Sequence, residues 1–413
     1  MTSPLRRFGL TGVIAGLGAV LTAVFLWRLG WPAVAYRDGD FFQFWAGPHA
    51  YLDGGSPYDG TWWTQIHLRE GSHALERPPQ LSATAPAWTS PYPPWTHLAL
   101  FPLALLPFAV AAPVWLVIQL SAVVAGLCAL RARVLVSTPT RDGFVLFGLA
   151  LASQPLWVIV AGGNVDGLLF GAIAGALAAS LAGRPALAGV LLGTLALKPH
   201  LFLLFLPVYL LTAPDRATTA RAFAATVAAQ VGASAALRPD WFAGWLTSMS
   251  ALGSSTGSNA TLWTLDRALP LLPQGALPMA AALATLGAFG MWWIRARPPF
   301  EPAIGAALCV SLALAPHGWS YDLVALLAVA AIVIELLAHA LIDRRTLGLA
   351  LLAGVFGVLP WLLYAVAFRR GGEEWTVGAP LALLALLMVV RRWSRIGSEA
   401  WTRVEREGAQ VIG

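Results

Sequence analysis

Charged residues are scarce in this chain of 413 residues. They make up 11% of the sequence, against about 25% in soluble globular proteins. Hydrophobic residues make up 58%, above the usual share of about 45–50%. Too few charges are present to cover the surface of soluble domains, so the composition excludes a soluble protein. We expect an all-α polytopic membrane protein.

Cysteine and lysine are also scarce. The two cysteines, Cys128 and Cys309, both lie in apolar runs, which excludes a disulfide framework or a cysteine-ligated zinc site. Of the 26 basic residues, 25 are Arg, and the single lysine, Lys198, lies in the middle of an apolar run. An ionisable side chain in such a position is expensive and is usually functional.

Several kinds of site are missing as well. The net charge of +6 is spread over short loops, and no basic run with interleaved aromatic residues indicates a nucleic-acid partner. There is no glycine-rich nucleotide loop. Asp38, Asp40 and Asp322 show no clean ligand spacing. We therefore predict no cofactor, no metal and no nucleic acid.

Long apolar runs alternate with short polar loops. Gly9–Gly30 follows a short basic stretch and is interpreted as an uncleaved first helix that starts in the cytoplasm. Pro107 precedes a second span, Val110–Leu130. The other runs are Gly143–Ala161, Val165–Leu181, Pro185–Leu211, Ala222–Leu237, Ala276–Ile294, Ala303–Ala315, Tyr321–Leu341, Leu347–Phe368 and Val377–Val390.

The run Pro185–Leu211 decides the predicted topology. If it crosses the membrane once, most of the later Arg residues face outside, whereas a hairpin with its tip at Lys198 puts them inside. Basic residues of short loops favour the cytoplasmic side, so we predict the hairpin. The result is a bundle of about twelve membrane helices with both termini cytoplasmic. Each arm would be about 20 Å long, so Lys198 would lie within the outer half of the membrane.

With this topology, unusual polar residues gather on the outer side. The first outer loop, residues 31–95, is the longest extramembrane segment, and a cytoplasmic tail, residues 391–413, ends the single domain. The candidate site residues on the outer side are Asp38, Asp40, Tyr92, Asn164, Asp166, Lys198, His200, His317, Tyr321, Asp322, Arg369 and Arg370.

Several motifs in this set resemble those of glycosyltransferase family 87. They are Asp40-Phe41-Phe42-x-Phe44-Trp45, Gly54-Gly55-Ser56-Pro57-Tyr58, Tyr92-Pro93-Pro94, Ala188 to Gly193 leading into Leu197-Lys198-Pro199, and Pro316 to Asp322. The resemblance implies a GT-C-like fold and an inverting transfer from a polyprenyl-phosphate-linked sugar, often mannose. The acceptor would be a cell-envelope lipid or glycan at the outer face of the plasma membrane.

The resemblance also implies roles for individual residues. Asp40 matches the first-loop acid that acts as catalytic base, and Lys198 matches the basic residue that meets the lipid phosphate. His200, Arg369 and Arg370 are further candidates for the phosphate. Some family members carry a His five residues after the proline, where this chain has Tyr321, and here His317 follows the proline directly. The remaining candidates are assigned to substrate binding.

Each assignment has a plainer alternative. Asp40 has a competitor in Asp38 and is also explained as a solvated acid beside Arg37. Lys198 has the length to snorkel to the interface, and an exposed Arg pair at a helix end often anchors the interface. Asn164 and Asp166 are equally suited to capping the helix that starts at Val165, and Asp322 suits a helix N-terminus.

Two other classes of function share many of these features. A transporter or flippase for a lipid-linked sugar would have a similar helix count and an intramembrane lysine. Transporters usually show matching broken helices in two halves, whereas this sequence has one such break, at Lys198-Pro199. A non-catalytic lipid-carrier partner in an envelope-assembly complex would tolerate the loss of Asp40. We favour the enzyme.

Overall fold

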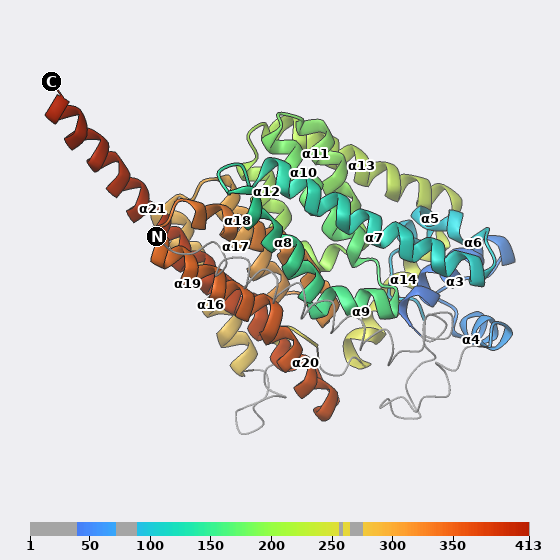
Figure 1. Ribbon diagram of the computed structural model, residues 1–413. Helices are drawn as coiled ribbons and strands as arrows, with labels where there is room; N and C mark the ends of the chain where they lie inside the picture. Colours follow the sequence, from blue (N-terminus) through green and yellow to red (C-terminus); the bar gives the residue numbers. More distant parts are fainter. Residues whose placement is uncertain (1–38, 72–88, 256–258, 265–275, 413) are drawn as a thin grey trace.

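The computed structural model describes residues 39–71, 89–255, 259–264 and 276–412, and these residues form helices and no strand. The helices pack into one bundle (Figure 1). The expected first helix, Gly9–Gly30, and the candidate residue Asp38 lie outside the described residues. The predicted all-α architecture is confirmed for the part that the structure describes.

The segment that is predicted to be the first outer loop is more helical than its sequence suggests. It contains α3 (Asp40–Asp53) and α4 (Gly60–Arg69), and α5 (Pro94–Ala99) and α6 (Phe101–Ala104) follow. Phe41, Phe42 and Phe44 of α3 are fully buried, and the Phe41 ring stacks on Trp115 with centroids 5.9 Å apart. Packing against the next long helix therefore stabilises α3, although its sequence has weak helical periodicity.

The following helices match the apolar runs closely. They are α7 (Phe108–Arg133), α8 (Thr140–Ala152), α9 (Gln154–Gly162) and α10 (Asp166–Leu181). The predicted span Gly143–Ala161 is divided by a bend of 48° between α8 and α9. Pro155 lies at the start of α9, where a missing backbone N–H is tolerated, so the bend follows from the sequence.

The predicted hairpin is present. Its first arm is α11 (Pro185–Gly193) with η1 (Thr194–Leu197), and its second arm is η2 (Pro199–Phe202) with α12 (Phe205–Thr212). A hydrogen bond of 2.9 Å joins Ser180, at the end of α10, to the hydroxyl of Tyr209, near the end of α12. The chain therefore returns to the level from which α11 started.

The next helix, α13 (Arg216–Leu237), confirms this reversal. It runs parallel to α11, because Gly189 lies against Thr219 and Gly193 lies against Thr226. A Cβ atom on Gly189 would lie 2.3 Å from the carbonyl oxygen of Thr219. The two glycines thus permit the close approach of these helices. After α13 comes α14 (Asp240–Ser255).

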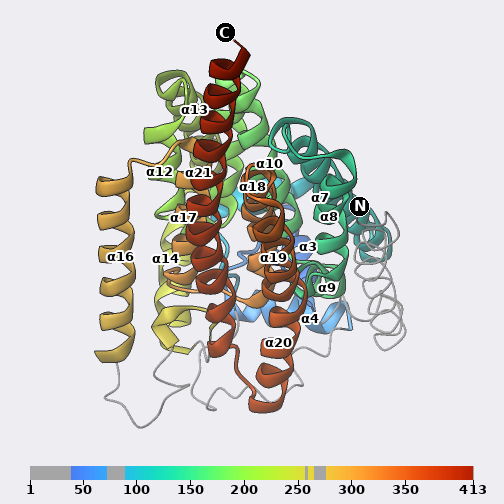
Figure 2. The ribbon, with the colours of Figure 1, turned by 60° about the vertical axis from the view of Figure 1, so that its left-hand side comes forward.

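The C-terminal half contains both the most buried and the least buried of the candidate membrane spans. Its elements are η3 (Leu262–Thr264), α16 (Ala276–Ala296), α17 (Phe300–Ala313), η4 (Ser320–Leu326), α18 (Leu327–Ala338), α19 (Ile342–Ala353), a π-helical turn η5 (Gly354–Val358), α20 (Leu359–Arg370), η6 (Glu374–Val377) and α21 (Gly378–Ile412). The η4–α18 span is 78% buried, against 11% for α16. In Figure 2, α16 stands at the edge of the bundle.

The tail that is predicted for residues 391–413 continues the last helix of the bundle. The helix α21 continues without a break through residue 412, and its end projects away from the bundle in Figure 1. Since no glycine or proline interrupts the helix between Val390 and Ile396, nothing in that stretch ends it.

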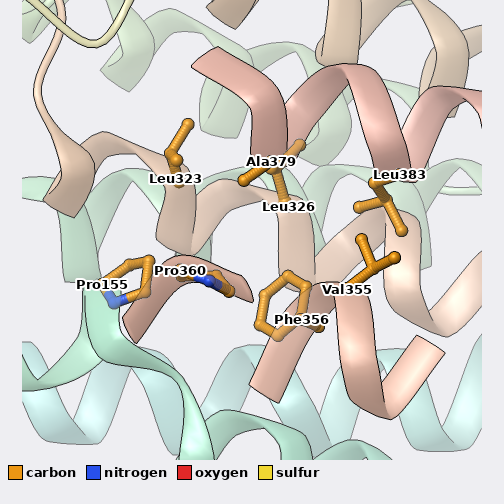
Figure 3. A pocket seen from close by; sticks show the side chains of 8 residues that line it. All are labelled: Pro155, Leu323, Leu326, Val355, Phe356, Pro360, Ala379 and Leu383. Carbon is orange, nitrogen blue, oxygen red and sulfur yellow. The ribbon is translucent and has the colours of Figure 1, made fainter. Parts of the chain in front are cut away.

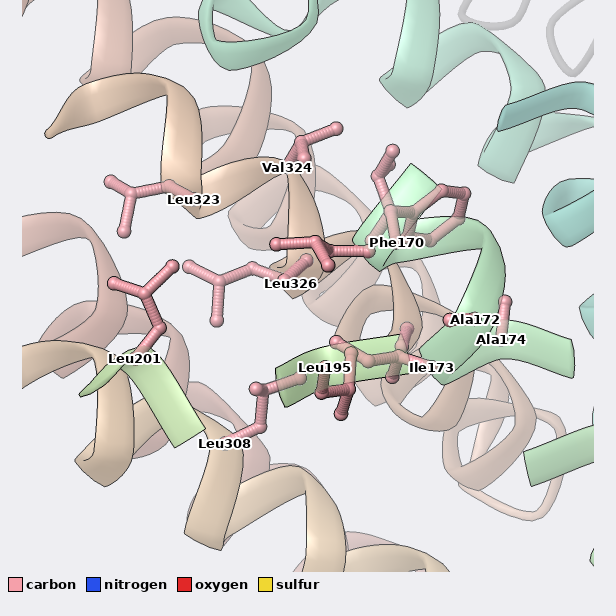
Figure 4. Close-up of a cluster of buried hydrophobic side chains, with 14 of the residues drawn as sticks. Phe170, Ala172, Ile173, Ala174, Leu195, Leu201, Leu308, Leu323, Val324 and Leu326 are labelled. Carbon is pink, nitrogen blue, oxygen red and sulfur yellow. The ribbon is translucent and has the colours of Figure 1, made fainter. Parts of the chain in front are cut away.

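Aliphatic residues fill the centre of the bundle. Figure 4 shows Phe170 and Ile173 of α10 close to Leu195, Leu308 and Val324, all of them buried. A small apolar cavity of about 10 Å³ lies beside Pro155, Phe356 and Pro360. Figure 3 shows the side chains that line it. A void of this size is no larger than one water molecule, so the packing there is tight.

Within the described residues, five helices are long and apolar enough to cross a membrane, or six if the bent pair α8–α9 counts as one span. These helices support an integral membrane protein. The predicted count of about twelve and the cytoplasmic position of both termini remain predictions.

The contact between α11 and α13 can be tested with Gly189→Ala. The added Cβ would meet a backbone carbonyl that cannot move without separating the helices, so we expect a loss of about 1–3 kcal/mol in stability. Thermal unfolding of the purified protein in detergent measures it. Gly232→Ala on α13 is the control, because a Cβ there has open space. Equal melting temperatures for both variants would contradict the proposed close contact.

Candidate functional site

The side chain of Lys198 is the centre of a buried polar cluster. Only 4% of the surface of Lys198 is exposed. The ammonium group donates to Asp166 at 2.9 Å, to Asp322 at 2.5 Å and to Asn164 at 3.3 Å. An ammonium group has three N–H donors, so all three are used. The hairpin tip is thereby bound to the start of α10 and to η4.

The local sequence explains why Lys198 is at the tip. Pro199 follows it, and proline disfavours a helical conformation in the preceding residue; Lys198 has φ −138° and ψ 65°. The break in the helix leaves two carbonyl groups without a helical partner, and two side chains from α5 donate hydrogen bonds to them. The Trp95 indole donates to the carbonyl of Ala196 at 2.7 Å, and the Thr96 hydroxyl donates to that of Leu197 at 3.1 Å.

Asp40 lies beside this cluster at the first position of α3. The Asn164 amide donates to its carboxylate at 2.9 Å, and the same amide accepts from Lys198 and from the backbone N–H of Val165. Asn164 therefore connects the candidate base to the lysine through one side chain. Burial raises the pKa of Asp40 and outweighs the opposing effects of Asn164 and Lys198.

Tyr321 and Asp322 complete the cluster from η4. The Asp322 carboxylate accepts the backbone N–H of Trp319 at 2.7 Å as well as the Lys198 ammonium. Lys198 lies 4.8 Å from the centroid of the Tyr321 ring. A hydrogen bond from Tyr321 also acts to lower the pKa of Asp40. Tyr321 thus bridges the lysine and the candidate base.

The cluster contains three carboxyl groups and one ammonium group. Removing such charges from water costs several kcal/mol per ion, and replacing a buried ion pair with apolar residues is often neutral or stabilising. The arrangement is therefore weak as a source of stability. A perturbed group of charges beside a cavity is a candidate functional site.

A pocket of about 260 Å³ opens next to Lys198. One part of its wall is apolar and comes from the hairpin tip and α14. The other part carries polar or aromatic side chains, namely Tyr92, Lys198, His200, His317, Trp319 and Tyr321. The pocket is therefore suited to a ligand with a polar head and an apolar chain.

The two histidines of this wall lie close together, with ring centroids 6.1 Å apart. The Trp319 indole donates to Nε2 of His317 at 2.9 Å. Burial lowers the pKa of His317 to about 4, so the ring is neutral near pH 7 and carries its proton on Nδ1. Within the described residues, Nδ1 of His317 and Nε2 of His200 have no hydrogen-bond partner.

Most of the predicted site residues thus meet at one place. Asp40, Asn164, Asp166, Lys198, Tyr321 and Asp322 form the cluster, and Tyr92, His200 and His317 line the adjoining pocket. Arg369 and Arg370 are exposed at the end of α20. Within the described residues, neither forms an ion pair with the cluster.

Sequence reasoning missed three residues behind the cluster. The Glu373 carboxylate accepts the backbone N–H of Ser320 at 2.6 Å and the Ser320 hydroxyl at 3.2 Å. The Gln154 amide donates to the same hydroxyl at 3.2 Å. The sequence feature that points to Glu373 is an acidic pair, Glu373-Glu374, after Gly371-Gly372. This feature does not show which residue Glu373 contacts.

The comparison with protein families agrees with this site. The family described as glycosyltransferase family 87 matches residues 88–317, more than half of the chain. The chain belongs to this family and is a membrane glycosyltransferase. No curated protein matches it. The matched part contains Asn164, Asp166, Lys198, His200 and His317, whereas Asp40, Tyr321 and Asp322 lie outside it.

The dependence of the cluster on Lys198 can be tested with Lys198→Met. This variant keeps an unbranched side chain that is only one atom shorter, but it leaves Asp166 and Asp322 buried without a counter-charge. We expect a loss of about 3–5 kcal/mol in stability, measured by thermal unfolding. Adding Asp166→Asn and Asp322→Asn should restore most of it. A single variant that melts like the unmodified protein would show that the ion pairs do not hold the three segments together.

Proposed function

We propose that the protein transfers a sugar from a polyprenyl-phosphate-linked donor to a hydroxyl group of a cell-envelope lipid or glycan. The transfer takes place at the outer face of the plasma membrane and inverts the anomeric configuration. A hexose such as mannose is the proposed sugar. Family membership supports the reaction class, and the cluster around Asp40 supports the mechanism.

One observation carries the mechanism, namely the placement of the Asp40 carboxylate. It lies beside the pocket wall, held by Asn164 and next to Tyr321, and the residue keeps part of its surface accessible. Its raised pKa makes it a stronger base than an exposed aspartate. An oriented carboxylate of this kind, next to a residue that lines the pocket, suits the removal of a proton from an acceptor hydroxyl.

The bond changes are simple. The acceptor oxygen forms a bond to the anomeric carbon while the bond from that carbon to the phosphate oxygen breaks. The electron pair of the broken bond leaves with the lipid phosphate, and Asp40 takes the hydroxyl proton. Attack from the side opposite the leaving group gives the inverted configuration.

Lys198 and the two histidines of the pocket differ in how many free hydrogen-bonding groups they offer to a phosphate. Lys198 lines the pocket, but its three donors are occupied and its charge is balanced by two carboxylates. The Nδ1–H of His317 is unpaired within the described residues and His200 lies next to it. We therefore assign the first hydrogen bonds to the phosphate to the histidine pair. The role of Lys198 is then to hold the neighbouring part of the pocket wall in position.

This assignment changes the proposed roles of two other residues. Asn164 and Asp166 are engaged by Asp40 and Lys198, so they position the cluster in place of binding sugar hydroxyls. Tyr92, Trp319 and Tyr321 line the pocket and offer aromatic surfaces to the sugar ring. The apolar wall from Pro199 and Leu203 suits the first part of the polyprenyl chain.

The mechanism can be tested with Asp40→Asn. We expect its turnover to fall by about 10²–10⁴-fold, the usual contribution of a general base. The assay follows labelled polyprenyl-phosphomannose and a cell-envelope glycolipid extract in membranes, and a panel of lipid-linked sugars covers other donors. Asp343→Asn, at an exposed position on α19, is the control and should behave like the unmodified protein. Full activity of Asp40→Asn with any donor would refute Asp40 as the base.

A further inference from the structure

Glu373 connects the turn after α20 to the candidate site. It lies in the short turn between α20 and η6 and is partly buried. Both of its carboxylate oxygens accept hydrogen bonds from Ser320, one from the backbone N–H and one from the hydroxyl. A neutral amide in its place would have only one acceptor oxygen, so the carboxylate is matched to this pair of donors.

Ser320 is the first residue of η4, and the next two residues enter the site. Tyr321 lies against Lys198, and Asp322 binds the lysine directly. The first N–H groups of a helix have no partner within the helix. Here two carboxylates take them, since Asp322 accepts the N–H of Trp319 and Glu373 accepts that of Ser320.

We propose that Glu373 is a positioning residue for the transfer reaction, which holds the start of η4 so that Tyr321 and Asp322 keep their places beside Asp40 and Lys198. This inference rests on the proposed function. Glu373 acts through Ser320, which is fully buried. Without its acceptor, the N–H of Ser320 would be buried and unpaired, and η4 would shift to reach another partner.

The charge of Glu373 makes this contact sensitive to pH. Burial raises its pKa to about 7, the charges of Asp322 and Asp40 act in the same direction, and the hydrogen bonds from Ser320 oppose them. Tyr364 of α20 also interacts with Glu373 electrostatically. Above pH 7 the carboxylate accepts two hydrogen bonds. As the pH falls through 7 it gains a proton, and its hold on Ser320 weakens.

The experiment measures turnover and hydrogen exchange in the purified full chain, with Glu373→Gln, Glu373→Asp and Glu374→Gln. Polyprenyl-phosphomannose and the glycolipid extract are the probes for turnover. We expect Glu373→Gln to lower kcat about tenfold with little change in KM, because the binding pocket is retained. Glu373→Asp keeps the charge and should recover part of the loss. Glu374→Gln, the neighbouring position, should match the unmodified protein.

Hydrogen exchange in residues 317–323 reports on η4 without any substrate. In the unmodified protein, exchange at about pH 6 should exceed that at about pH 8 after correction for the intrinsic rates, since Glu373 titrates between them. In Glu373→Gln the difference in exchange between the two pH values should be absent, and exchange should be fast at both pH values. This comparison of the unmodified protein at two pH values remains informative even if a variant does not fold.

Two results would overturn the inference. One is exchange in residues 317–323 that is the same in Glu373→Gln and in the unmodified protein at both pH values. The other is an unchanged kcat and pH profile in Glu373→Gln. Failure of the proposed function is distinguishable from either, because the unmodified protein would then transfer none of the lipid-linked sugars while its exchange step persisted.

Discussion

The ion pairs of one buried lysine determine how this bundle is assembled around its site. The ammonium group of Lys198 joins the start of α10, the tip of the hairpin and the start of η4. In an apolar interior such a charge requires partners on all of its donors. Because Asp166 and Asp322 are 156 residues apart in the chain, the lysine is what brings these segments to a common point.

The site then depends on short polar side chains that each serve two partners. Asn164 contacts both Asp40 and Lys198, and Asp322 contacts both Lys198 and the backbone of Trp319. In a network of this kind, the position of one group sets the position of the next. The candidate base is thereby oriented by the same contacts that neutralise the lysine. The pocket beside them carries histidines that have donors or acceptors to spare.

Much of this arrangement was predictable from local features of the sequence. The apolar runs predicted α7 and α10 to within a few residues, and Lys198-Pro199 predicted the turn of the hairpin. Asn164 and Asp322 were candidates because polar groups next to apolar spans are uncommon, and Asp40 was a candidate through the resemblance to glycosyltransferase family 87. The helices α3 and α4 were not predicted, because no local pattern shows the aromatic contacts that stabilise them. The Phe41 ring of α3 stacks on Trp115 of α7, and Trp63 and His67 of α4 contact Phe42 of α3.

The sequence by itself determined the class of protein and the position of the chain reversal, because composition, hydrophobic length and proline act locally. It made Lys198 a candidate through its position in an apolar run and Asp40 a candidate base through the resemblance to glycosyltransferase family 87. Only the tertiary structure decided which side chains form hydrogen bonds and ion pairs with one another. It showed that the donors of Lys198 are all occupied, that Trp319 sets the proton position of His317 and that Glu373 reaches Ser320. These contacts join residues from separate helices, and such pairings depend on how the helices pack.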